Sequence, residues 1–256
     1  MDILFSQLSP AAFAAACAVT LLAGFVKGAT GFAMPLIMIS GMGLFLEPAL
    51  AVAALILPIL MSNGLQVARF GWAMAVDSTR DFRRYVLIVC VMIVASAQLL
   101  PVLPPELMFL ILGIPVVMLS IIQLLGLRFS VPANRRGLAD WTIGGTAGVL
   151  GGLSGVWGPP TVLYLIALDT PKDRQIVVTG VVFGLGAVVL FLAHLRSGVL
   201  NGETLPVSAA LLIPAFLGMQ MGFWAGDKLN QALFRKVTLI VLVVAGLNLV
   251  RRGLIG

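Results

Sequence analysis

The sequence has few charged residues: lysine, arginine, aspartate and glutamate together make up 10% of its 256 residues. Soluble domains typically carry about 25%. Hydrophobic residues account for 60% of the chain, and the mean hydropathy is +1.11. Apolar runs such as 85–103 and 107–127 are long enough to cross the hydrocarbon core of a bilayer. The sequence therefore predicts an all-α protein that crosses the lipid bilayer several times.

Cysteine and histidine are scarce, with two cysteines and one histidine in the whole chain. Cys17 and Cys90 both fall in apolar segments, so we expect small buried side chains there and not a disulfide or a metal pair. His194 lies near the end of its apolar segment, which predicts a position at the membrane interface. Because no nucleophile–base pair, metal-ligand spacing or nucleotide-binding glycine loop occurs, we expect no enzymatic activity, no metal and no cofactor.

The charges that are present are mostly basic and give a net charge of +6. Aromatic residues do not interleave with the basic ones, so we expect no nucleic-acid partner and place the lysines and arginines in cytoplasmic loops. Glu47, Glu106 and Asp169 fall at the ends of apolar segments, and no acidic residue is expected deep inside a span. This argues against a dedicated proton or sodium site and leaves the coupling ion open.

One glycine-containing motif occurs twice. Residues 24–35, GFVKGATGFAMP, and residues 148–159, GVLGGLSGVWGP, both follow the pattern G-x-x-x-G-x-[ST]-G-x-x-x-P. Matched interruptions of two apolar segments point to the binding site in transporters built from repeats. The sequence therefore predicts two homologous transmembrane repeats, 1–127 and 139–256, joined by a cytoplasmic linker at 128–138.

The interrupted segments 11–46 and 138–168 are too long for a single straight crossing. Either each crosses once, giving eight crossings, or each is a re-entrant hairpin accompanied by three spans, which makes the halves inverted repeats. The second topology collects more of the lysines and arginines on one side, so the positive-inside rule favours it. It places both termini outside the cell inner (plasma) membrane. The polar stretch 69–84 is expected to be a loop with at most one short interfacial helix.

The chemistry expected at the breaks is anion binding. Where a helix restarts, its first amide groups have no partner within the helix and carry the positive end of its dipole. Lys27 is the one basic residue placed within an apolar segment, and its counterpart at the other break is Gly151. Burying an ammonium group without a charged partner costs free energy, so we expect an anionic substrate to be the partner of the Lys27 ammonium. The alternative is that Lys27 extends to the membrane interface.

The candidate substrate-binding residues are glycines, hydroxyls and a few large or polar side chains near the breaks. Trp157 either caps the pocket or packs in the core, and Gln98 and Gln220 either bind substrate or bond across helices. Asn63 and Tyr164 are weaker candidates. Gly218, Gly222 and Gly226 are expected to form a helix-packing face. The full set is Lys27, Gly28, Thr30, Gly31, Ser154, Gly155, Trp157, Gly158, Gln98 and Gln220.

The stretches GATGFAMP, GGLSGVWGPPTVLYL and ALFRKVTLIVLVVAGLNLVRR resemble the TauE/SafE family of membrane permeases. The resemblance covers nearly the whole chain and implies movement of sulfite, sulfonates or related small sulfur anions, commonly outward. We therefore expect a secondary transporter of a small anion in which one half rocks against the other. The alternatives are a passive anion channel and a non-transporting accessory membrane subunit. The sequence is compatible with a homodimer but does not specify one.

Overall fold

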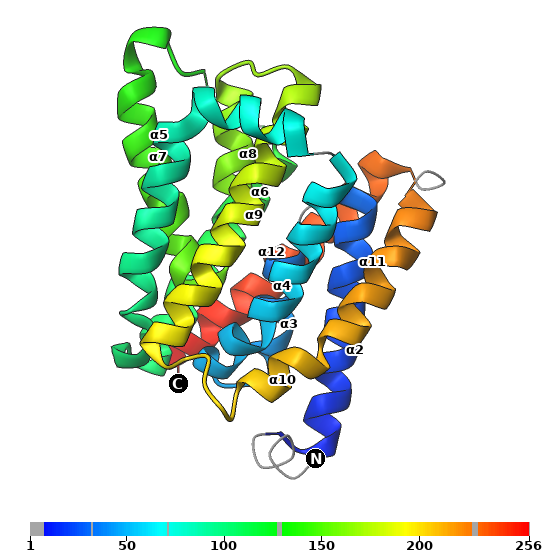
Figure 1. Cartoon of the computed structure of the whole chain (residues 1–256). Helices are drawn as coiled ribbons and strands as arrows, with labels where there is room; N and C mark the ends of the chain where they lie inside the picture. The colour runs from blue at the N-terminus through cyan, green and yellow to red at the C-terminus, as the bar shows by residue number, and fades with distance from the viewer. Residues whose placement is uncertain (1–7, 32, 71, 127–129, 227–229, 256) are drawn as a thin grey trace.

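The computed structural model describes residues 8–31, 33–70, 72–126, 130–226 and 230–255, and every regular element in those ranges is a helix (Figure 1). The first half contains α2 (Pro10–Thr30), α3 (Met34–Met42), α4 (Pro48–Phe70), α5 (Trp72–Ala97), η1 (Leu100–Val102) and α6 (Pro105–Leu124). The second contains η2 (Ala133–Arg135), α7 (Arg136–Ser154), α8 (Gly158–Ala167), α9 (Lys172–Ser197), α10 (Leu205–Ala210), α11 (Leu212–Gly226) and α12 (Gln231–Ile255).

Seven helical segments of the described chain are long and apolar enough to cross a membrane, which confirms an all-α, multi-pass membrane protein. The loop expected at 69–84 is wrong. Helix α4 continues to Phe70 and α5 begins at Trp72, although the apolar part of α5 starts only at Arg80. A helix satisfies its own backbone hydrogen bonds in water and in hydrocarbon alike, so a polar stretch can extend a span without ending it.

Both predicted breaks occur, and the incoming helix ends in the same way at each, although the residue before the outgoing helix differs, with φ 75° at Ala33 and φ −95° at Trp157. Helix α2 ends at Gly31 with φ 80°, and α7 ends at Gly155 with φ 73°. Each glycine N–H donates back to a carbonyl four residues earlier, Lys27 O and Gly151 O, at 2.7 Å. A proline then sits in the first turn of the outgoing helix, where its missing N–H costs no helical hydrogen bond. Left-handed glycine followed by proline is therefore the cause of each interruption.

The chain folds back on itself at both breaks. A Cβ placed on Gly41 of α3 would lie 2.7 Å from the side chain of Val19 in α2. In the second half, the Val131 N–H, which precedes α7, donates to the Ala167 carbonyl at the end of α8 at 2.8 Å. At the first break α3 thus runs back alongside α2, and at the second break the segment begins and ends at the same end of the molecule. The two segments enter from opposite ends (Figure 1).

The two halves are interlocked through glycine contacts. Helix α2 packs mainly on α11 of the second half, and α7 packs mainly on α5 of the first half. A Cβ on Gly28 would lie 2.3 Å from the Met219 carbonyl oxygen, and one on Gly222 would lie 2.1 Å from the Phe25 carbonyl oxygen. Gly218 faces the α2 backbone in the same way, so the predicted packing role is confirmed for Gly218 and Gly222.

These contacts divide the molecule into two groups that do not follow the sequence halves. One group contains α2, α3, α4, α10 and α11, on the right of Figure 1, and the other contains α5, α7, α8 and α9, on its left. Helices α6 and α12 pack on each other. The groups meet chiefly where α9 packs against α4.

Candidate functional site

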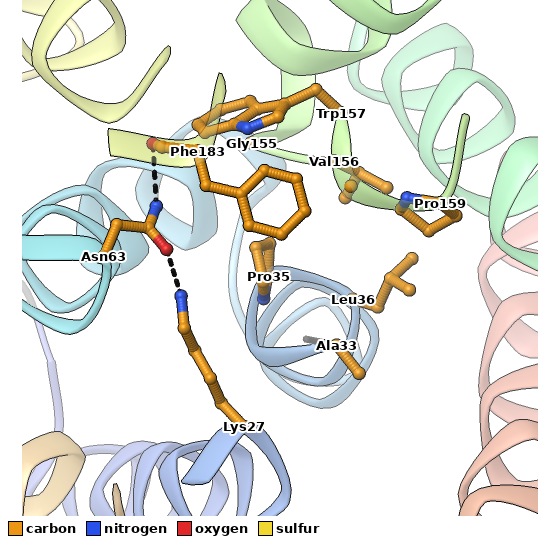
Figure 2. A pocket seen from close by; sticks show the side chains of 11 residues that line it. Lys27, Ala33, Pro35, Leu36, Asn63, Gly155, Val156, Trp157, Pro159 and Phe183 are labelled. Atoms are coloured by element: carbon orange, nitrogen blue, oxygen red, sulfur yellow. Dashed lines mark hydrogen bonds between the residues drawn. The ribbon is translucent and has the colours of Figure 1, made fainter. Parts of the chain in front are cut away.

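The two breaks line a single pocket between the two helix groups (Figure 2). One wall comes from the first break and α4, and the other from the second break and α9. The lining residues are Lys27, Ala33, Pro35, Leu36 and Asn63 on one side, and Gly155, Val156, Trp157, Gly158, Pro159 and Phe183 on the other. The cavity measures about 20 Å³, which is room for roughly one water molecule. A sulfite ion, with one sulfur and three oxygens, is larger than one water molecule.

Lys27 lies in the last turn of α2 and is 2% exposed, so the alternative that it extends to the membrane interface is wrong. Its Nζ donates a hydrogen bond to Oδ1 of Asn63 (Figure 2). The Asn63 amide nitrogen donates in turn to the carbonyl oxygen of Phe183 at 3.0 Å. The partner recorded for the ammonium is therefore a neutral amide and not a carboxylate.

Trp157 is 2% exposed and forms part of the pocket wall. A Cβ added to Gly186 of α9 would lie 3.0 Å from its indole ring, so the side chain also packs against α9. Trp157 therefore packs in the core, which was one of its two expected roles, and its side chain also lines the pocket.

Of the predicted site residues, Lys27, Gly155, Trp157 and Gly158 line the pocket. Gly31 is the left-handed cap beside it, and Gly28 packs against α11. The Ser154 hydroxyl donates to the Leu150 carbonyl oxygen within its own helix at 2.6 Å. The side chain of Thr30 lies outside the described part of the structure.

The two glutamines lie away from the pocket. Gln98 donates from Nε2 to the Ala193 carbonyl oxygen of α9 at 3.2 Å, which is the cross-helix bond that was one of its two expected roles. Gln220 is exposed on α11. Neither is among the lining residues.

Sequence reasoning underestimated Asn63 and missed Phe183. The available signal for Asn63 was its polarity within an otherwise apolar span, whereas Phe183 contributes a backbone carbonyl, which any residue type could supply. Pro35 and Pro159 were in the motif but were interpreted only as helix interruptions, although both line the pocket.

His194 lies in the last turn of α9, where it is fully buried within the protein. Its Nε2 donates to the Gly152 carbonyl oxygen at 2.9 Å, and its Nδ1 lies 3.1 Å from the Ser197 hydroxyl. Gly152 is in the last turn of α7, where carbonyl groups lack partners within the helix. The histidine therefore supplies a hydrogen bond that the end of this helix needs.

Asp140, near the start of α7, is a buried acidic residue and is only 7% exposed. It accepts a hydrogen bond from the Tyr164 hydroxyl, which joins the two arms of the second hairpin. The rings of Tyr164 and Tyr85 stack with centroids 4.6 Å apart. The Tyr85 hydroxyl lies 3.0 Å from that of Thr161, which donates to the Trp157 carbonyl oxygen at 2.7 Å. Hydrogen bonds and one ring stack thus connect Asp140 to the pocket wall.

A family model described as sulfite exporter TauE/SafE matches residues 16–249, a range that includes both breaks. The chain belongs to the TauE/SafE sulfite exporter family. This membership identifies a transporter family and agrees with the seven membrane-capable helices of the described chain. No match was found among curated proteins or solved structures.

Proposed function

We propose that this TauE/SafE chain carries sulfite or small sulfonates across the cell inner membrane by alternating access, with the anion held between the two breaks. The observation that carries the proposal is the buried Lys27 ammonium, whose recorded partner in the pocket is the neutral Asn63 amide. Ionisable groups buried in membrane bundles usually mark substrate or ion pathways. A bound anion would be a charged partner for Lys27, and the hydrogen bond between Lys27 and Asn63 would break as the anion binds.

The backbone around the pocket supports an anionic substrate. Helices α3 and α8 both begin at the pocket, and neither has a side-chain hydrogen bond at its N-terminal cap. Prolines at positions 35, 159 and 160 have no N–H, so the amide groups at the two helix starts are those of Met34, Leu36 and Gly158. These amides and the positive ends of the two helix dipoles add to the charge of Lys27. The restriction to sulfur anions comes from the family.

The small size of the cavity supports a carrier rather than an open channel. A cavity with room for about one water molecule is too narrow for a row of hydrated anions to pass through. The walls of the pocket must therefore separate before an anion binds. We propose that the moving bodies are the two interlocked groups of helices and not the sequence halves. Moving one sequence half against the other would break the close glycine contacts between α2 and α11 and between α5 and α7.

We further propose that the hairpins are re-entrant and that the halves are inverted repeats. The fold-back at each break, with the hairpins entering from opposite ends, supports this arrangement. Arg84, Arg136 and Arg174 lie at one end, where Arg136 and Arg174 both bond to Asp81. The positive-inside rule makes this end cytoplasmic, with the start of α2 and the end of α12 outside.

The test is anion flux into liposomes containing the purified protein, with a panel of sulfite, a sulfonate and a plain carboxylate. We expect saturable flux of the sulfur anions. Lys27→Ala should weaken binding about tenfold to a hundredfold, the usual effect of losing a hydrogen bond to a charged group. The control is Lys236→Ala, because Lys236 is exposed on α12.

Three results would contradict the proposal. Flux that does not saturate would favour a passive channel. A protein that moves none of the anions would favour an accessory subunit. Equal affinity of the wild type and Lys27→Ala for the anion would show that Lys27 does not bind the substrate.

A further inference from the structure

A groove on the outer surface of the bundle lies between α5 and α7, separate from the pocket at the breaks. Two basic side chains stand at one end, and apolar side chains form the rest. Its lining residues are Arg83, Arg84, Leu87, Ile88, Val91, Met92 and Trp141. The groove has a volume of about 330 Å³, far larger than the pocket at the breaks. It touches none of the residues that line that pocket.

The apolar part of the groove follows one stripe of α5. From Arg84 to Met92 this stripe runs for about 12 Å along the helix axis, at 1.5 Å per residue. Leu87 is 62% exposed, Val91 63% and Trp141 58%, whereas Ile88 is buried and forms the floor. In a membrane, such a surface faces acyl chains.

The two arginines are exposed, and neither has an acidic partner among the described residues. Asp81, the nearest carboxylate along α5, pairs with Arg174. Both arginines lie close to Arg80, where the apolar span of α5 begins, which is the level of lipid headgroups. Trp141 is a residue type enriched at that level. A pair of unpaired cations above an apolar groove matches the charge and shape of an anionic phospholipid.

The fold itself does not require these arginines. At the matching positions of the second repeat stand Val207 and Ser208, which are both buried. The basic pair therefore occurs in only one of the two repeats. Its end of the molecule is the one that the positive-inside rule makes cytoplasmic, and that leaflet carries the anionic lipids.

We infer that the groove between α5 and α7 is a binding site for an anionic phospholipid of the cytoplasmic leaflet, with its phosphate on Arg83 and Arg84 and an acyl chain along Leu87 and Val91. This inference rests on the membrane orientation proposed above and not on the transported substrate. Basic surfaces between helices on the cytoplasmic side are known to bind such headgroups.

The site is connected to the second break through α7. Met92 lines the groove, and a Cβ on Gly148 would lie 2.5 Å from the Met92 Cβ. Gly148 opens the second glycine motif, which ends at the pocket. A bound acyl chain therefore supports the packing of α5 on α7, next to the segment that carries Gly155 and Trp157.

The experiment uses the whole protein in vesicles that contain either phosphatidylglycerol or phosphatidylcholine with brominated acyl chains. Bromine quenches tryptophan fluorescence on contact, and the Trp141→Phe variant isolates the Trp141 signal by difference. We expect phosphatidylglycerol to quench Trp141 at about tenfold lower mole fraction than phosphatidylcholine does. The double variant Arg83→Gln/Arg84→Gln should lose this preference, and the control Arg196→Gln/Arg251→Gln, at the opposite end, should keep it.

Native mass spectrometry of the same proteins provides a second readout, with retained phosphatidylglycerol expected for wild type and control but not for Arg83→Gln/Arg84→Gln. Equal quenching by both lipids, or a preference that survives the double variant, would overturn the inference. So would complete displacement of phosphatidylglycerol by inorganic phosphate, because the site would then recognise a free anion and not a lipid. None of these outcomes depends on whether the protein transports sulfite.

Discussion

The indole of Trp157 packs against Gly151, the residue that stands at the position of Lys27 in the other half of the chain. A Cβ on Gly151 would lie 2.9 Å from the Trp157 ring. At the first break the sizes are exchanged, since the counterpart of Trp157 is the small Ala33 and the long side chain belongs to Lys27. Two breaks whose incoming helices both end at a left-handed glycine therefore give the pocket one cationic wall and one aromatic wall.

Replacing Trp157 by alanine should enlarge the pocket and destabilise the protein. Large-to-small changes of this kind in a packed core cost about 3–5 kcal/mol. We expect a clear fall in Tm in detergent, together with a shift of relative flux from sulfite toward a bulkier sulfonate. Trp224→Ala is the control, because Trp224 is 72% exposed and does not line the pocket. An unchanged ratio of the two fluxes would show that the indole does not limit substrate size.

Asn63→Asp should place a permanent negative charge next to Lys27. The new carboxylate would satisfy the ammonium, so an incoming anion would meet a neutralised pair. We expect at least about tenfold weaker binding of sulfite, comparable to losing a charge-assisted hydrogen bond, with Tm unchanged or raised. The measurement is equilibrium binding by calorimetry. Asn248→Asp on α12 is the control, and equal affinity in the two variants would contradict the assignment of Asn63.

Gly152→Ala should destabilise the contact between α7 and α5. A Cβ at this position would lie 2.1 Å from the Ser96 hydroxyl oxygen and 2.5 Å from the Ile93 carbonyl oxygen. Overpacking of this kind costs about 1–3 kcal/mol. Gly145→Ala in the same helix is a matched control, because its Cβ would have no heavy atom within 4 Å. A Tm that falls equally in both variants would point to helix propensity and not to the contact.

Gly31 tests the backbone requirement at the first break. Its φ of 80° lies in the left-handed region, yet a Cβ there would have only the Gln66 side-chain nitrogen, at 3.9 Å, within reach. Gly31→Ala should therefore cost about 1–2 kcal/mol through conformation alone. Gly31→Asn should cost less, because asparagine tolerates this region better than other side chains. Thermal unfolding of both variants, side by side, checks the order, and a larger fall for asparagine would contradict it.

The positions and form of the breaks were predictable from the sequence. Gly31, Gly155, Pro35 and Pro159 act on their immediate neighbours, so a local motif is sufficient to specify them. A buried position was one of two interpretations of Lys27 that the sequence left open, and its 2% exposure decides between them.

The packing partner of each motif glycine and the hydrogen-bond partner of each buried polar side chain depend on which helices are in contact. Gly28 and Gly152 belong to the same repeated motif as Gly155, but they do not line the pocket. Gly28 packs against α11, and Gly152 packs against α5. The burial of His194 and Asp140 likewise follows from contacts with distant segments.

The sequence alone determined that this chain spans a membrane and where two of its apolar segments are interrupted, because hydrophobicity, glycine and proline act over a few residues. Only the tertiary structure decided that the halves interlock, that Lys27 reaches Asn63, and that four of the predicted residues surround one pocket. Those relationships join residues far apart in the chain, and they arise from the close packing of helices whose glycine faces fit together.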